Sequence, residues 1–89
     1  MPYINTASRE ALSPELEPLI ELIRNGGLWK AGDLNYIITR LAMAYMAQRQ
    51  SYARYNDVIG ALECAKLELY RRRIAPYEDG KIKINGDVE

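Results

Sequence analysis

Hydrophobic residues recur at three- and four-residue steps along the first half of segment 33–76. The positions that carry this pattern are Leu34, Ile37, Ile38, Leu41, Ala42, Tyr45 and Met46. Residues at this spacing lie on one face of an α-helix. Asp33 offers a side-chain acceptor to the free N–H groups of a first turn and suits the positive end of the helix dipole, so we expect the helix to begin there.

The same spacing returns in the second half of this segment. It runs through Val58, Leu62, Ala65 and Leu69, flanked by Ile59, Leu67, Tyr70 and Ile74. Only Gln50 and Ser51 separate the two patterns, and Ser51 can cap a second helix, so we predict an antiparallel helical hairpin with a very short turn. A second helix that begins at Asn56, after a tight loop at 52–55, is the alternative. Pro76 cannot donate a backbone hydrogen bond, which predicts the end of the hairpin there.

A shorter helical region precedes the hairpin. Asn5 or Thr6 can cap one or two turns that run through Leu12. Pro14 suits the first position of a following helix. Pro18 would then remove a hydrogen bond inside that helix, so the alternative is that the regular helix begins at Pro18. The buried stripe expected for this helix is Leu16, Leu19, Ile20 and Ile23.

The connector and the two ends of the chain are expected to be irregular or extended. Residues 2–4 are typical of a short extended arm. Asn25, Gly26 and Gly27 are expected to end the first helix. The connector 28–32 contains the single tryptophan, Trp29, which is either a lid over the core or part of an interface; we favour the interface. Near the C-terminus, residues 81–84 alternate between basic and apolar side chains and lie between turn dipeptides, which is typical of a short strand or an extended arm lying on another surface.

Chain length sets the expected architecture. An 89-residue chain forms one domain and buries a limited fraction of its surface, so oligomerisation is a natural source of additional core. Gly60, inside the second predicted helix, indicates a close contact between helices and favours an oligomer interface. We therefore predict a single all-α domain over residues 1–89. In it, a short N-terminal helix packs on the long antiparallel hairpin (33–76), and an extended C-terminal arm (77–89) reaches a neighbouring copy in a homo-oligomer.

Charge and cysteine content limit the partners and the compartment. Twelve basic and twelve acidic side chains cancel, which argues against general nucleic-acid binding or attachment to an anionic membrane through bulk charge. A single cysteine, Cys64, excludes a disulfide within the chain and is typical of a reducing cytoplasm. No apolar run approaches the roughly 20 residues that a membrane-spanning helix needs, so we expect no membrane partner.

Candidate catalytic groups are few. The chain has no histidine, which removes the usual general base and the usual zinc ligand. Glu63 and Glu68 are five positions apart and point in different directions on a helix, and segment 34–56 has no acidic residue, so a magnesium-dependent nucleotide hydrolase is a minor alternative. Glu68 precedes Arg72 by four residues and is expected to pair with it. We therefore expect no enzymatic activity, no metal and no cofactor.

Tyrosine and arginine dominate the recognition chemistry of the chain. There are seven Tyr and no Phe, and eight Arg against four Lys. Arginine binds phosphate in a bidentate manner and tyrosine rings stack on bases, which together suit a nucleotide-derived ligand. The predicted ligand-binding residues are Tyr36, Arg40, Tyr52, Arg54, Tyr55, Asn56, Arg72 and Arg73. We expect their arginines to contact phosphates, and their tyrosines and Asn56 to contact base or ribose.

Structural interpretations of the same residues remain open. Tyr45 lies on the apolar row, so it is expected in the core rather than at a ligand. The arginines at 71–73 complement the dipole at a helix C-terminus without any ligand. Arg49 and Arg54 flank a turn and are typical of solvated residues, while Tyr52 and Tyr55 suit either packing under the turn or a pocket wall.

Several segments carry a resemblance to a known family. They read MPYI, GDLNYIITRLAMAY, NDVIGALECAKLELYRRRIAPYEDGKI and NGDV. Over nearly the whole chain the sequence resembles a small uncharacterised family of phage and bacterial proteins without an assigned activity. The resemblance implies a phage or prophage origin. By analogy of class alone, this composition resembles that of short phage proteins that assemble into symmetric oligomers and hold host nucleotide immune signals in pockets between subunits.

These observations combine into one leading hypothesis. The chain is expected to be a non-enzymatic protein of the host cytoplasm. As a homo-oligomer, it would sequester an anionic nucleotide-derived small molecule, namely a host immune second messenger such as a cyclic ADP-ribose or a cyclic oligonucleotide. The alternative is a protein-interaction module that masks a host protein through Trp29 and exposed apolar surface.

Overall fold

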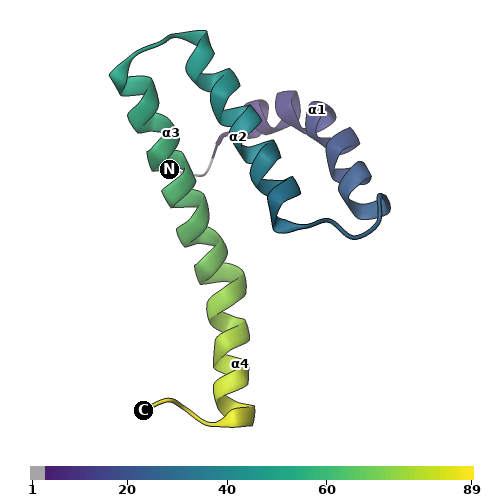
Figure 1. Cartoon of the computed structure of the whole chain (residues 1–89), viewed down its shortest axis with the longest axis vertical. Coiled ribbons are helices and arrows are strands. Elements are labelled where there is room, and N and C mark those ends of the chain that lie inside the picture. Colours follow the sequence, from purple (N-terminus) through teal and green to yellow (C-terminus); the bar gives the residue numbers. More distant parts are fainter. Residues whose placement is uncertain (1–3) are drawn as a thin grey trace.

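The computed structural model describes residues 4–89, and the arm expected at residues 2 and 3 lies outside them. The elements in chain order are α1 (Thr6–Asn25), α2 (Ala31–Gln48), α3 (Tyr52–Leu69), the π-helical segment η1 (Tyr70–Ile74) and α4 (Ala75–Asn85). No strand occurs among the described residues. The all-α prediction is therefore confirmed (Figure 1).

The first helix is longer than predicted. Asn5 caps α1, and its side-chain oxygen accepts a hydrogen bond from the Ser8 N–H at 2.8 Å. The helix then continues through Pro14 and Pro18 to its end, so the expected break near Leu12 and a new start at either proline are both wrong. Each proline removes a single bond to the carbonyl four residues earlier, and the remaining bonds of the 20-residue helix carry it through.

The hairpin turn follows the prediction closely. Helix α2 begins at Ala31 rather than Asp33, because the Asp33 carboxylate accepts a hydrogen bond from the Lys30 N–H at 2.8 Å and so acts from the third position of the helix. Ser51 caps α3, where its hydroxyl oxygen accepts from the Arg54 N–H at 3.2 Å. The predicted cap is confirmed, and the alternative start at Asn56 is wrong.

The C-terminal part contradicts the prediction. The end of the hairpin at Pro76 and the extended arm at 77–85 are both wrong, because α4 spans these residues. The π-helical turn explains how the helix passes the proline. The N–H of Ala75 donates to the carbonyl of Tyr70, five residues earlier, so Pro76 falls at the start of a new α-helical register, where its missing N–H is tolerated.

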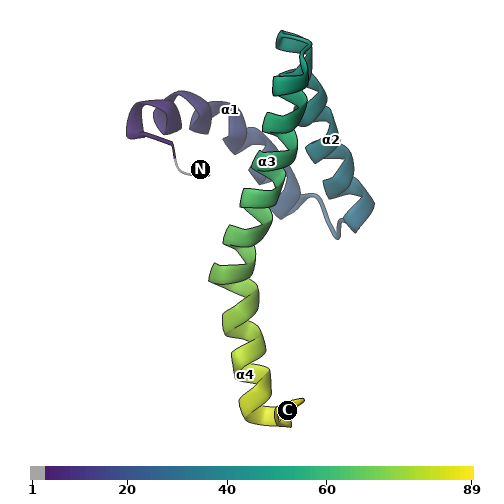
Figure 2. The same ribbon diagram turned by 90° about the vertical axis from the view of Figure 1, so that its left-hand side faces the viewer.

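The helices form an open arrangement. Figures 1 and 2 show α3, η1 and α4 as one long rod, with α1 and α2 beside its α3 half and α4 projecting away alone. Helices α2 and α3 return antiparallel from their turn and diverge toward the far ends. No Cα atom of α1 lies within 8 Å of one in the other described helices. Close packing of the first helix on the hairpin thus stays a prediction.

No side chain among residues 4–89 is buried. The radius of gyration is 16.7 Å, against about 12 Å for a compact chain of this length. Gly60 illustrates the open surface, since a Cβ atom built on it would meet nothing within 4 Å. The close helix contact predicted at Gly60 is therefore not made within the described part of the chain.

Candidate functional site

An arginine–tyrosine stack joins the two helices beside the α2–α3 turn. The Arg54 guanidinium carbon lies 3.9 Å from the centroid of the Tyr45 ring, close enough for a cation–π interaction. Arg54 Nη2 also donates a hydrogen bond to Gln48 Oε1 at 2.8 Å. Because Gln48 ends α2 and Arg54 lies in the first turn of α3, this half-buried arginine connects the two helix ends.

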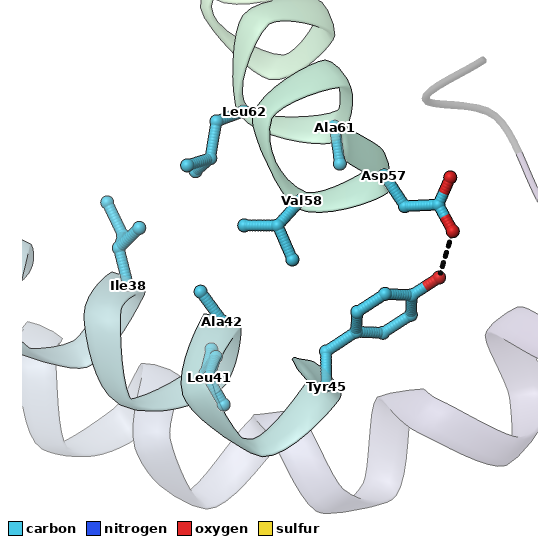
Figure 3. Close-up of a pocket in the computed structure, with 8 residues that line it drawn as sticks. All are labelled: Ile38, Leu41, Ala42, Tyr45, Asp57, Val58, Ala61 and Leu62. Carbon is cyan, nitrogen blue, oxygen red and sulfur yellow. Dashed lines mark hydrogen bonds between the residues drawn. The ribbon is translucent and has the colours of Figure 1, made fainter. Parts of the chain in front are cut away.

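A second cross-helix contact begins at the same tyrosine. Tyr45 Oη donates a hydrogen bond to Asp57 Oδ2 at 3.1 Å (Figure 3). Beyond it, α2 and α3 form a hollow of about 370 Å³, which we name the α2–α3 groove. Its lining residues are Ile38, Leu41, Ala42, Tyr45, Asp57, Val58, Ala61 and Leu62. Apart from the Tyr45 hydroxyl and the Asp57 carboxylate, the lining side chains are apolar.

A more polar hollow of about 470 Å³ lies at the turn itself. Its lining residues are Arg49, Ser51, Ala53, Arg54 and Asp57, and we name it the arginine hollow. Its charged lining residues are two arginines and one aspartate, and the N-terminus of α3 adds its positive partial charge. Asp57 belongs to the walls of both hollows, so a mainly apolar surface and a cationic surface meet at this residue.

One pair of predicted site residues forms on α2. Arg40 Nη1 donates a hydrogen bond to Tyr36 Oη at 2.7 Å, and its guanidinium carbon lies 5.7 Å from the centroid of the Tyr36 ring. These two residues are four positions apart and therefore share a face of α2. Arg40 precedes Gln48 by eight residues, about 12 Å along the helix axis. The pair therefore lies apart from the arginine hollow and does not line it.

Three predicted residues lie on the first two turns of α3 without lining either hollow. Tyr52 is 79% exposed and Tyr55 46% exposed, and Asn56 is also exposed. Within the described chain no side-chain hydrogen bond involves these three. Their exposure leaves them available to a ligand or a second chain, and packing under the turn is not observed.

The predicted arginines at the far end belong to η1. Arg71 and Arg72 both form ion pairs with Glu68, the first at 2.8 Å, so the predicted Glu68–Arg72 pair is confirmed. Arg73 forms no ion pair within residues 4–89. Arg72 follows Arg54 by 18 residues of one continuous rod, about 27 Å along its axis. In one chain, the eight predicted residues therefore occupy three separate places, and only Arg54 lines the arginine hollow.

Sequence reasoning missed the partners of Arg54. Tyr45 was expected in the core but is 37% exposed and bridges α2 to Arg54 and Asp57. Arg49, interpreted as solvated, lines the arginine hollow. Antiparallel helices bring together residues that lie at equal distances on either side of their turn. Matching such residues across the predicted turn could have identified these contacts.

Other chemistry is sparse in the described part of the chain. Cys64 is a free, half-buried thiol. No group of three or more His, Cys, Asp or Glu residues that could hold a metal ion occurs among residues 4–89. Within the same range, none of the helices combines the length and the apolarity needed to cross a membrane.

Comparison with known proteins identifies the family. Comparisons with curated proteins and with solved structures each give no significant match. One family model, described as a domain of unknown function (DUF6899), matches residues 1–88. The match includes both helices of the turn, the arginine hollow and the η1 segment. Because it spans nearly the whole sequence, the chain belongs to the DUF6899 family.

Proposed function

We propose that this chain is a non-enzymatic, phage-type binding protein that assembles with copies of itself and sequesters an anionic nucleotide-derived small molecule. The ligand class is a host immune second messenger, such as a cyclic ADP-ribose or a cyclic oligonucleotide. The protein would act in the cytoplasm of the host cell and would need no cofactor, because sequestration requires binding alone.

The observation that carries this proposal is the arginine hollow. Its volume of about 470 Å³ falls within the range of roughly 300–1,000 Å³ that is usual for small-molecule pockets. Arg49 and Arg54 can each present a planar guanidinium to a phosphate, which favours bidentate binding. The exposed rings of Tyr52 and Tyr55, on the same helix end, supply faces on which a base can stack.

The remaining predicted contacts require more than one chain. Arg40 with Tyr36, and Arg73 on η1, lie too far along their helices to share one small ligand with Arg54 of the same chain. A pocket that contains all three groups would form between copies. All eight predicted residues can therefore contribute to ligand binding only if the protein acts as a homo-oligomer.

The test is ligand retention by the purified protein, measured by native mass spectrometry with cyclic dinucleotides and cyclic ADP-ribose isomers. We expect unmodified ligand in whole-number stoichiometry, and we expect Arg54→Gln to lower affinity at least tenfold, since it removes a charge-assisted contact worth roughly 1.5–3 kcal/mol. Arg24→Gln is the matched control, because Arg24 is an exposed arginine of α1 that forms an ion pair with Glu21 at 3.6 Å and lines neither hollow. No bound ligand across the panel would refute the proposal.

The second candidate is a module that masks a host protein, and the exposed apolar surface favours it. Twenty-four large hydrophobic side chains in the described part are exposed, whereas Trp29 is half-buried beside Gly26. A specific host partner in a pull-down, without bound small molecule, would support this candidate. Turnover of a nucleotide with magnesium would instead support the hydrolase alternative.

A further inference from the structure

The isolated chain exposes too much surface for its mass. Its accessible area is 8051 Å², whereas a folded monomer of 10.2 kDa exposes about 5,300 Å². The difference is about 2,700 Å² per chain. No described side chain is buried, so this excess includes the apolar faces that the helices would normally cover.

The α2–α3 groove is one part of this uncovered apolar surface, which extends along all the described helices. Aliphatic side chains of both helices line it, with Ile38 and Ala42 on α2 pointing toward Val58 and Leu62 on α3 (Figure 3). Helix α1, the remaining helix on this half of the molecule, makes no close approach to either wall. Leu41 and Leu62 are 58% and 41% exposed, although both lie on the apolar rows of their helices.

We propose that a second copy of this chain covers the α2–α3 groove. The area supports this occupant, because obligate homodimer interfaces bury roughly 2,000–5,000 Å² in total, and half of the excess on each of two copies already supplies about 2,700 Å². An interface of this size exceeds what a small ligand or a short peptide would cover. This assembly supplies the oligomer on which the proposed function rests, but it does not depend on any ligand.

Charge distribution favours the same occupant. Between residues 34 and 56 every charged side chain is an arginine, whereas α1 carries four glutamates and two arginines. The two segments of one chain do not lie against each other. The hairpin 31–69 as a whole is neutral, with four basic and four acidic side chains, so the acidic α1 of a second copy is complementary only to the part that carries Arg40, Arg49 and Arg54. The zero net charge of each copy removes overall repulsion between them.

The first test places a charge in the groove. Ala42→Lys and Ala61→Lys each introduce an ammonium group on a lining position, and Thr39→Lys is the matched control on an exposed position of α2 that does not line the groove. Light scattering after size exclusion should give a multiple of 10.2 kDa for the wild type and Thr39→Lys. Both groove variants should fall to 10.2 kDa at the same concentration.

A photo-crosslinking test covers the case in which the lysine variants fail to fold. Replacing Leu62 with p-benzoylphenylalanine should give a covalent product of two chains on irradiation, and the same replacement at Thr39 should give much less. A wild-type mass of 10.2 kDa at all concentrations would overturn the proposal. So would an oligomer in which position 62 crosslinks no better than position 39, because the copies would then meet elsewhere.

The same samples separate this inference from the proposed function. An oligomer joined through the groove that retains no cyclic nucleotide would refute the proposed function and leave the inference intact. Ligand bound by an oligomer that forms through another surface would refute the inference alone. The oligomer mass and the crosslink therefore test the inference, and ligand retention tests the proposed function.

Discussion

Loss of the Ser51 cap should destabilise the turn that builds the arginine hollow. The Ser51 hydroxyl oxygen accepts a hydrogen bond from the Arg54 N–H at 3.2 Å, and Ser51→Ala leaves that donor without its partner. Replacing a serine N-cap by alanine costs about 1 kcal/mol of stability. For a domain of 60–100 residues this corresponds to a fall in Tm of about 4–8 °C.

A second serine provides the matched control for this measurement. Ser13 lies inside α1 and its hydroxyl donates to the Arg9 carbonyl at 2.7 Å, so Ser13→Ala leaves no backbone donor unsatisfied. Alanine is also favoured inside a helix, by up to about 0.7 kcal/mol, so Tm should stay constant or rise. The assay is thermal unfolding followed by circular dichroism at 222 nm. All samples need equal protein concentration, because oligomerisation makes Tm depend on it.

The outcome that refutes the reasoning is equal melting of Ser51→Ala and the wild type. That result would mean that water replaces the cap at no cost, and that the turn is held mainly by the contacts of Arg54. Ser51→Asp then distinguishes the cap from other effects of the substitution. Aspartate restores a side-chain acceptor at the same position, so it should recover most of the lost stability.

Three further changes test other parts of the molecule. Gly60→Ala should raise stability by about 1 kcal/mol in a melting assay, because the new methyl group meets no atom within 4 Å; a lower Tm would instead indicate a second copy packed against Gly60. Arg40→Ala combined with Arg73→Ala should abolish retention of a cyclic dinucleotide while the oligomer mass stays constant, and unchanged affinity would remove both residues from the site. Glu68→Gln should lower the free energy of unfolding by less than about 1 kcal/mol, since its arginine partners are largely exposed; a larger loss would show that these ion pairs become buried in the assembly.

Local patterns predicted the helices well where local interactions decide them. The apolar spacing from Leu34 onward indicated α2, and Ser51 indicated the start of α3, because both signals depend on residues within one or two turns. Tyr36 with Arg40 and Glu68 with Arg72 were also predictable, since side chains four apart meet on a helix surface.

The prediction failed where the hydrogen-bond register changes. Pro76 was expected to end the helix, and this expectation holds only if the preceding residues keep the α-helical register. The π-helical turn at 70–74 shifts that register by one residue and places the proline where no N–H is required. Nothing in the local composition of YRRRI distinguishes a π turn from an α turn, so the extended arm was a reasonable but wrong inference.

The site was only partly predictable for a different reason. Arg54 was selected for its charge and its place at the turn, but its stacking partner Tyr45 was assigned to the core because it lies on the apolar row. A tyrosine can belong to the apolar row and also stack on an arginine when its ring lies at the edge of a groove and its hydroxyl reaches across to the other helix. A one-dimensional pattern gives the face of the helix but not the position along the groove, which depends on how α2 and α3 cross.

Asp57 connects the two hollows and therefore the two proposals. Its carboxylate accepts the Tyr45 hydroxyl on the groove side and forms part of the wall of the arginine hollow on the other. A second copy that covers the groove would exclude water from the Tyr45–Asp57 hydrogen bond, which strengthens it and keeps the carboxylate on the groove side. Arg49 and Arg54 would then be the dominant charges facing the hollow, so assembly through the groove would favour an anionic ligand at the turn.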